Sequence, residues 1–242
     1  MPKPSNIELP TGEKIPILYE DRSVLAIDKP RSWMLVPYSW QKTNRNLQAA
    51  LASSIAARDF WARSRSLKFL RSVHRLDADT SGVLLLAKSP GAVKAFGVLF
   101  ESRKMEKAYL AVVLGAPNPN EWTCRLKLAP DPDEVGRMKV DARHGKEAET
   151  HFRVLQSAGS TTLVQARPVT GRTHQIRVHL AESGHPVIGD PLYGPRAAKK
   201  EPELGLRAIY LAYVDPFVRR RVEIRAPVEE FAREYGFDIP KL

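Results

Sequence analysis

Two stretches of the sequence combine residue types that can do chemistry. The first reads HRLDADTSG at 74–82 and leads directly into the apolar run Val83–Ala87. A carboxylate at the mouth of a buried strand, partly desolvated and close to a cation, is a common setting for nucleophilic or acid–base chemistry. The same residues also allow an ordinary turn in which Arg75 pairs with Asp77 or Asp79. Asp77 is therefore a candidate nucleophile that needs a second, independent observation.

The second stretch reads ARPVTGRTHQIRVHLAESGHPVIGDPLYG at 166–194. A predicted strand ends before the turn at 170–173, and a predicted helix follows, so backbone N–H groups and the positive helix end would point at one spot and favour an anion. His174 and Arg177 lie three residues apart and would share one helix face. Ile176 would lie on another face, packed inward.

A metal site in this second stretch is not expected. Histidines five residues apart on a helix do not converge, and no HExxH pair occurs. The residues considered for such a site are His174, His179, His185 and Asp190.

Tyr109 is a third candidate, at the start of a predicted strand in the segment EKAYL at 106–110. Its ring could belong to the core or could stack on a base. The residue alone does not decide between the two.

The elements that must position these residues alternate irregularly along the chain. Apolar patterning predicts strands at about 16–20, 23–27, 83–88, 108–114, 122–129, 149–155, 163–169, 210–214 and 222–225. It predicts helices at about 44–60, from Pro90 onward, at 173–182 and at 227–235. A regular βαβ order is missing, which argues against a parallel nucleotide-binding sheet. We predict an α+β fold with a mixed, mainly antiparallel sheet flanked by helices, in which residues 16–242 form one catalytic domain and 1–15 an N-terminal extension.

Composition restricts the class of protein. The chain has 242 residues, of which 43% are hydrophobic and 27% charged, as in ordinary globular proteins. Its 38 Lys and Arg exceed its 27 Asp and Glu, giving a formal charge of +11 that suggests a polyanionic partner such as nucleic acid. The one cysteine, Cys124, excludes an intrachain disulfide, is expected to be buried, and agrees with a reducing cytoplasm. The N-terminus lacks a signal-like pattern, and no apolar run is long enough for a bilayer, so we expect no membrane association.

Together these segments resemble the pseudouridine synthases of the RluA family, which act on large-subunit rRNA or tRNA. The resemblance covers residues 16 to 228, and the His of HRLD favours this group over the small-subunit group. The matching segments, in order, are VLAIDKPRSWMLVP at 24–37, HRLDADTSGVLLLAK at 74–88, EKAYLAVVLG at 106–115, KEAETHFRVL at 146–155, and TGRTHQIRVHLAESGHPVIGDPLYG at 170–194.

Two features depart from the family pattern. The segment after DKP continues Arg31-Ser32-Trp33, without the glycine that the family usually carries there. No S4-type RNA-binding domain fits before the first predicted strands. Substrate selection is then expected from the catalytic domain itself or from loops such as Arg31–Arg45.

The resemblance implies roles in uridine isomerisation for three residues. Asp77 would be the nucleophile, attacking ribose C1′ or uracil C6, or acting by a glycal route. Arg177 would be its charged partner, since a nearby cation favours the ionised carboxylate. Tyr109 would pack on the target base and help remove the C5 proton, and Ile176 would form part of an apolar wall.

Base flipping is also implied, because a stacked uridine cannot reach a buried carboxylate. Arg75 would take the vacated place in the stack, and Arg172 would contact phosphate. His74 and Thr80 would hold the shape of the loop. The expected partner is rRNA or tRNA bound by a monomer that needs no cofactor or metal, and the basic surplus should surround Asp77, with Arg75 and Arg172 near its centre. A base-releasing glycosylase and a non-catalytic RNA-binding protein remain the alternatives.

Overall fold

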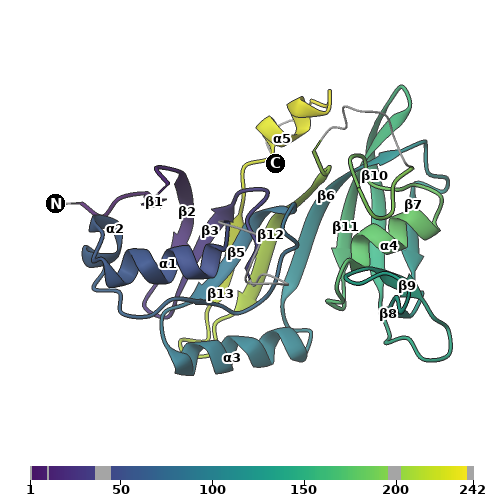
Figure 1. Cartoon of the computed structure of the whole chain (residues 1–242). Helices are drawn as coiled ribbons and strands as arrows, with labels where there is room; N and C mark the ends of the chain where they lie inside the picture. Colours follow the sequence, from purple (N-terminus) through teal and green to yellow (C-terminus); the bar gives the residue numbers. More distant parts are fainter. Residues whose placement is uncertain (1, 10, 36–44, 196–202, 239–242) are drawn as a thin grey trace. The chain divides into compact units, whose positions relative to one another are not determined.

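The computed structural model describes residues 2–9, 11–35, 45–195 and 203–238 (Figure 1). The chain divides into two compact units. The first contains Met1–Met105 and Tyr210–Ala226, and the second contains Glu106–Ile209 and Pro227–Leu242. Few helices and mainly antiparallel strand pairs confirm the predicted α+β class. The expected boundary between an extension at 1–15 and a catalytic domain at 16–242 stays a prediction.

Strands of the first unit surround a completely buried strand, β5, which carries no exposed residue. β5 pairs antiparallel with β3, whose Lys29 lies opposite Gly82 and whose Val24 lies opposite Ala87. The strands are β1 (Asn6–Glu8), β2 (Lys14–Glu20), β3 (Val24–Lys29), β4 (Arg71–Ser72), β5 (Ser81–Ala87), the later part of β12 (Leu206–Val214) and β13 (Arg221–Arg225). Because β5 is apolar throughout, the polar segment before it must lie at its edge.

Two helices of the first unit, α1 (Leu47–Ala56) and α3 (Pro90–Glu101), begin at side-chain caps. The Asn46 side chain accepts a hydrogen bond from Ala49 N at the start of α1, and Ser89 does the same for α3. α3 packs its Phe96 into the apolar core of this unit. A short helix, α2 (Phe60–Arg63), follows α1.

The second unit is built on four antiparallel strands in the order β6, β11, β10, β7. Its apolar core includes the buried Cys124 and packs one face of α4. The elements are β6 (Glu106–Leu114), β7 (Glu121–Cys124), β8 (Leu128–Pro130), β9 (Met138–Val140), β10 (Thr150–Ala158), β11 (Thr161–Pro168), α4 (Gln175–Glu182) and α5 (Glu229–Glu234).

Three predicted elements need correction. The strand expected at 122–129 is two strands, because β7 pairs with β10 whereas Leu128 pairs with Val140 of β9. The helix expected at 44–60 ends at Ala56, and its expected first residue lies outside the described residues. The helix expected from Thr173 begins at Gln175. Patterning did not predict β1, β4, β9 and α2, which have two to four residues each.

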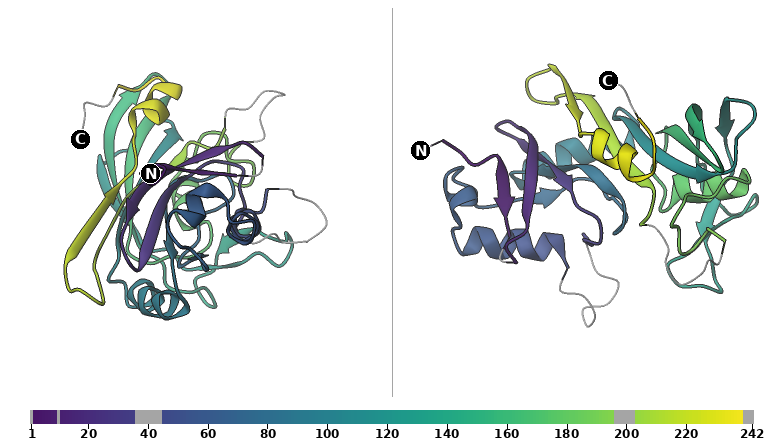
Figure 2. Two further views of the ribbon diagram at one scale, coloured as in Figure 1. Left: turned by 90° about the vertical axis from the view of Figure 1, so that its left-hand side faces the viewer. Right: turned by 90° about the horizontal axis from the view of Figure 1, so that it is seen from above.

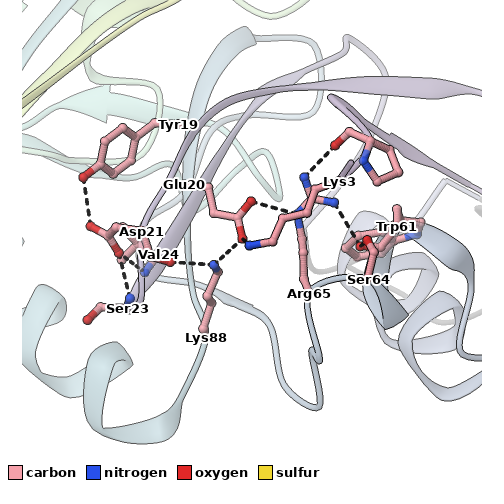
Figure 3. A network of polar contacts seen from close by, with 11 residues as sticks. Lys3, Tyr19, Glu20, Asp21, Ser23, Val24, Trp61, Ser64, Arg65 and Lys88 are labelled. Atoms are coloured by element: carbon pink, nitrogen blue, oxygen red, sulfur yellow. Dashed lines mark hydrogen bonds and ion pairs between the residues drawn. The ribbon is translucent and has the colours of Figure 1, made fainter. Parts of the chain in front are cut away.

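An ionic network fastens the edge of the first unit around Glu20, at the end of β2 (Figure 3). Its carboxylate accepts from Arg65 Nε at 2.8 Å and from Lys88 Nζ at 2.7 Å. Arg65 also donates to the carbonyl oxygens of Trp61 and Pro4. Burial alone would raise the pKa of Glu20, but the hydrogen bonds and charges of Lys88 and Arg65 hold that pKa below its usual value. Glu20 thus connects the start of the chain, α2 and β5.

Replacing Glu20 by Gln should lower the free energy of unfolding by about 1–3 kcal/mol at neutral pH, because Arg65 and Lys88 lose their counter-charge and one of the two acceptor oxygens becomes an NH₂ donor. A carboxyl with a lowered pKa stabilises the fold above its unfolded value, near 4.5, and that contribution disappears as the pH falls through the folded value. The difference from wild type should therefore shrink in acid. Urea denaturation of wild type and variant, at neutral pH and again below the unfolded pKa of about 4.5, measures this difference in the free energy of unfolding. The control is Glu8→Gln, since Glu8 is exposed. An equal effect from the control would contradict the assignment.

Candidate active site

Asp77 lies in the loop that leads from β4 into buried β5. It is half-buried, and Leu76 before it and Thr80 after it are buried. The N–H of Thr80 donates to the Asp77 carbonyl oxygen at 3.2 Å, which closes a tight turn. Arg75 is exposed and makes no ion pair with any described carboxylate, so the surface pair with Asp77 or Asp79 that composition allowed does not form.

His74 and Thr80 border this loop. His74 Nε2 accepts from Leu85 N at 3.0 Å, and its ring stacks on Phe100 with centroids 4.7 Å apart. Thr80 Oγ1 is buried and has no hydrogen-bond partner among the described residues. These contacts are ones that a loop-shaping role would need, and the roles themselves stay predictions.

Lys29 holds the Asp77 loop in place by hydrogen bonds to its backbone. The sequence did not point to it as a site residue. Its side chain is fully buried, and Nζ donates to the carbonyl oxygens of Ala78 at 2.7 Å, Thr80 at 3.0 Å and Pro30 at 2.9 Å. Burial lowers its pKa to about 8, although the carboxylates of Asp79 and Asp77 act in the opposite direction. The available signal was a lysine at the end of the apolar run of β3.

Lys29 should give the protein a characteristic alkaline pH dependence. Between about pH 8 and 10.5 the unfolded chain keeps a proton on this lysine that the folded chain has lost, so the free energy of unfolding rises with pH. Lys29→Met lacks this contribution. The stability difference between wild type and Lys29→Met should therefore widen from about pH 7.5 to about pH 9.5 in thermal melts. Exposed Lys68→Met is the control, and a constant difference would show that burial does not shift the Lys29 pKa.

Tyr109 and Ile176 contact the same apolar cluster in the second unit. Tyr109, on β6 opposite Ala166 of β11, is half-buried against this cluster, and Ile176 of α4 belongs to it. Two residues before Tyr109, Lys107 Nζ donates to the Thr170 carbonyl oxygen at 3.0 Å. Burial lowers the pKa of Lys107 to about 8. Lys107 therefore ties the tyrosine strand to the turn before α4.

The turn before α4 differs from the expected anion site. Gln175 fills it, because Gln175 Oε1 accepts from Arg172 N at 2.9 Å and from Thr170 Oγ1 at 2.7 Å. One backbone N–H that was expected to face an anion is thus already bound. The Arg172 side chain donates from Nε to the Glu147 carbonyl oxygen at 2.9 Å. Its phosphate contact stays a prediction.

His174 is not part of the helix, so its expected sharing of a helix face with Arg177 is wrong. It has a left-handed backbone, with φ of 53°, and occupies the position before the first helical residue. Its Nδ1 lies 2.9 Å from the hydroxyl of Tyr193. The reason is local, because Gln175 and not His174 satisfies the polar groups of the turn.

Arg177 forms a buried, two-pronged ion pair with Asp190. Nε and one terminal nitrogen each donate to an Asp190 carboxylate oxygen at 2.7 Å. Burial alone would raise the pKa of Asp190, but Arg177 and the backbone N–H groups of Leu192 and Tyr193 lower it overall. The Arg177 guanidinium also lies 5.2 Å from the centre of the Tyr193 ring. Asp190 was considered only as a metal ligand, and its acid character in GDPLYG was the signal for this pairing.

The structure thus brings the predicted residues together in two groups. Asp77, Arg75, His74 and Thr80 belong to the first unit, and Tyr109, Arg172, Ile176 and Arg177 belong to the second. The role of Arg177 toward Asp77 stays a prediction. Among the described residues, no three His, Cys, Asp or Glu side chains gather in a way that could hold a metal ion. No described helix is long and apolar enough to cross a membrane.

Known proteins share these segments and this fold. Residues 23–182 match the RNA pseudouridylate synthase family, which covers well over half of the chain. The chain belongs to this family. It is 31% identical to the dual-specificity RNA pseudouridine synthase RluA of Escherichia coli, over 93% of this chain and 98% of that protein. These matches confirm the resemblance drawn from HRLD and the segments around it.

Two further relatives extend the comparison. The ribosomal large subunit pseudouridine synthase C of Vibrio cholerae is 36% identical over 88% of this chain, which spans 65% of that protein's length. The solved structure of human RNA pseudouridylate synthase domain containing 1 superposes with a TM-score of 0.70 at 28% identity, covering 88% of this chain and 83% of that one. The family fold is therefore present.

Replacing Asp190 by Asn should destabilise the second unit strongly. The change leaves the buried Arg177 guanidinium without its counter-charge, which costs about 3–5 kcal/mol. Chemical denaturation followed by far-UV circular dichroism measures the loss. Glu182→Gln, an exposed carboxylate at the end of α4, is the control. A loss below about 1 kcal/mol would show that solvent or another group replaces Asp190.

Proposed function

We propose that this chain is an RNA pseudouridine synthase that isomerises uridine in rRNA or tRNA. The observation that carries the proposal is Asp77 in HRLD, held at the mouth of buried β5 inside the segment that matches the family. One relative is named for the ribosomal large subunit and another for dual specificity toward RNA, which supports an RNA substrate and, among RNAs, rRNA. We propose a monomer working in the cytoplasm, with residues 16–242 as its catalytic domain.

The reaction replaces the N1–C1′ bond of uridine by a C5–C1′ bond. The Asp77 carboxylate attacks C1′ or C6, or the C2′ proton leaves to give a glycal, and in each route the N1–C1′ bond breaks. The freed uracil turns and C5 bonds to C1′, while the bond from Asp77 to C1′ or C6 breaks or, in the glycal route, the proton returns to C2′. The C5 proton then leaves, and N1 gains a proton. No net oxidation occurs and no group is added. In this proposal Tyr109 packs on the base and takes part in removal of the C5 proton.

In this proposal the Arg177 guanidinium stabilises the ionised form of the Asp77 carboxylate. This guanidinium is fixed by Asp190 through two hydrogen bonds, so it can face a second anion without losing its orientation. In the proposed complex that anion is Asp77. Arg75, exposed in the same loop as Asp77, fills the space that the flipped uridine leaves.

Asp77→Asn should abolish pseudouridine formation while RNA binding survives, because only the nucleophile is lost. Carbodiimide mapping of rRNA and tRNA after incubation with the purified protein measures the product. Asp79→Asn, an exposed carboxylate two residues away, is the matched control and should keep activity. Full activity of Asp77→Asn would overturn the assignment. RNA that loses mass would instead indicate a base-releasing glycosylase, and RNA bound but unchanged by wild type would indicate a non-catalytic binding protein.

A further inference from the structure

The hairpin that joins β12 and β13 exposes apolar and basic residues together. In its tip, defined here as Pro216–Arg221, Phe217 is 53% exposed and Val218 is 64% exposed. Arg219 and Arg220 are exposed beside them. The tip thus places two neighbouring apolar side chains beside two guanidinium groups.

Hydrogen bonds fix the shape of this tip. The Asp215 carboxylate accepts from Phe217 N at 2.7 Å and from Val218 N at 2.9 Å, and Asp215 N donates to the Arg220 carbonyl oxygen at 2.8 Å. Arg219 has φ of 57° and donates its N–H to the Asp215 carbonyl oxygen at 3.0 Å. The exposed side chains are thus presented by an ordered turn, and the one acid of the turn is buried.

Positive charge at the tip is not balanced. On β13, Arg221 and Arg225 share Glu223, at 2.9 Å and 3.6 Å. Arg219 and Arg220 pair with no carboxylate in the described part of the chain. An aromatic face beside unpaired guanidinium groups matches the needs of RNA, whose bases stack on rings and whose phosphates attract arginine.

The tip lies at the end of the first unit that is opposite to Asp77. It ends beside α3 in Figure 1 and in the left view of Figure 2, and the Phe217 ring lies 6.1 Å from that of Phe96. Tyr19, near the end of β2, packs against the core cluster that contains Tyr213, two residues before Asp215. The tip therefore adjoins the β2–β3 turn.

The distance between the two sites follows from β5. The β2–β3 turn lies next to the Ala87 end of β5, whereas the Asp77 loop enters at Ser81. Seven residues at about 3.3 Å each separate these ends by roughly 20 Å. This corresponds to about six base steps of a stacked strand.

We propose that the hairpin tip is a second RNA-contact site, which holds the RNA flanking the target uridine through Arg219, Arg220 and the Phe217 ring. The proposal rests on the proposed function for the identity of the polyanion. It places part of the basic surplus away from Asp77, where only RNA long enough to reach both sites benefits. RNA length then becomes one basis of substrate choice.

The test removes the charges without disturbing the turn. In R219N/R220Q, Asn tolerates the left-handed backbone at position 219. Binding is measured by fluorescence anisotropy in an Asp77→Asn background, with uridine oligomers of about 4 and about 20 nucleotides. We expect the Kd of the long oligomer to rise about tenfold and its salt dependence to weaken by about two phosphate contacts, with no change for the short oligomer. Phe217→Leu should raise the long-oligomer Kd about fivefold or more without changing the salt dependence.

K14Q/K68Q is the matched control, because it removes two exposed charges of the same unit that lie outside the hairpin. An equal loss in this control, or an unchanged long-oligomer Kd in R219N/R220Q, would overturn the proposal. The proposal would also be overturned if R219N/R220Q weakened binding to ribosomal particles but not to the long oligomer, because the tip would then contact a protein partner. Pseudouridine formation by wild type is assayed separately, so that failure of the proposed function is distinguished from failure of this site.

Discussion

A buried ammonium group holds the loop on which the proposed chemistry depends. The Lys29 side chain, at the end of β3, donates hydrogen bonds to the carbonyl oxygens of Ala78 and Thr80. These carbonyl groups belong to the turn from Asp77 to Thr80, so one lysine side chain holds the turn that carries the carboxylate. Burying a cation is unfavourable in itself. The three hydrogen bonds and the carboxylates nearby offset that cost and make the loop dependent on β3 and β5 being paired.

The second unit also orients a buried cation by hydrogen bonds, here to a carboxylate and not to carbonyl oxygens. Arg177 is buried on α4 and oriented by Asp190, which is in turn held by the backbone N–H groups of Leu192 and Tyr193. Both arrangements fix a charged group by hydrogen bonds to residues that the fold brings next to it. A functional group held in this way needs little reorganisation when a substrate arrives, which is the condition for electrostatic catalysis.

Sequence reasoning predicted much of this protein and failed in identifiable places. The apolar run placed β5 within two residues at each end, because every residue of that strand is buried, and Pro90 marked the first residue of α3. The residue types of HRLD pointed to Asp77. Lys29, Asp190 and Gln175 escaped because their roles are hydrogen bonds to residues distant in sequence or to backbone groups. Periodicity carries no signal for such contacts. His174 was misplaced since a left-handed residue before a helix has the same local pattern as a helical one.

The measurement that tests the central claim most directly uses RNA tritiated at uridine C5. Formation of a C5–C1′ bond must expel the C5 hydrogen, so wild type should release tritium to water in step with pseudouridine formed, and Asp77→Asn should release none. Release of free uracil that keeps its tritium, or loss of tritium without dependence on Asp77, would contradict the account.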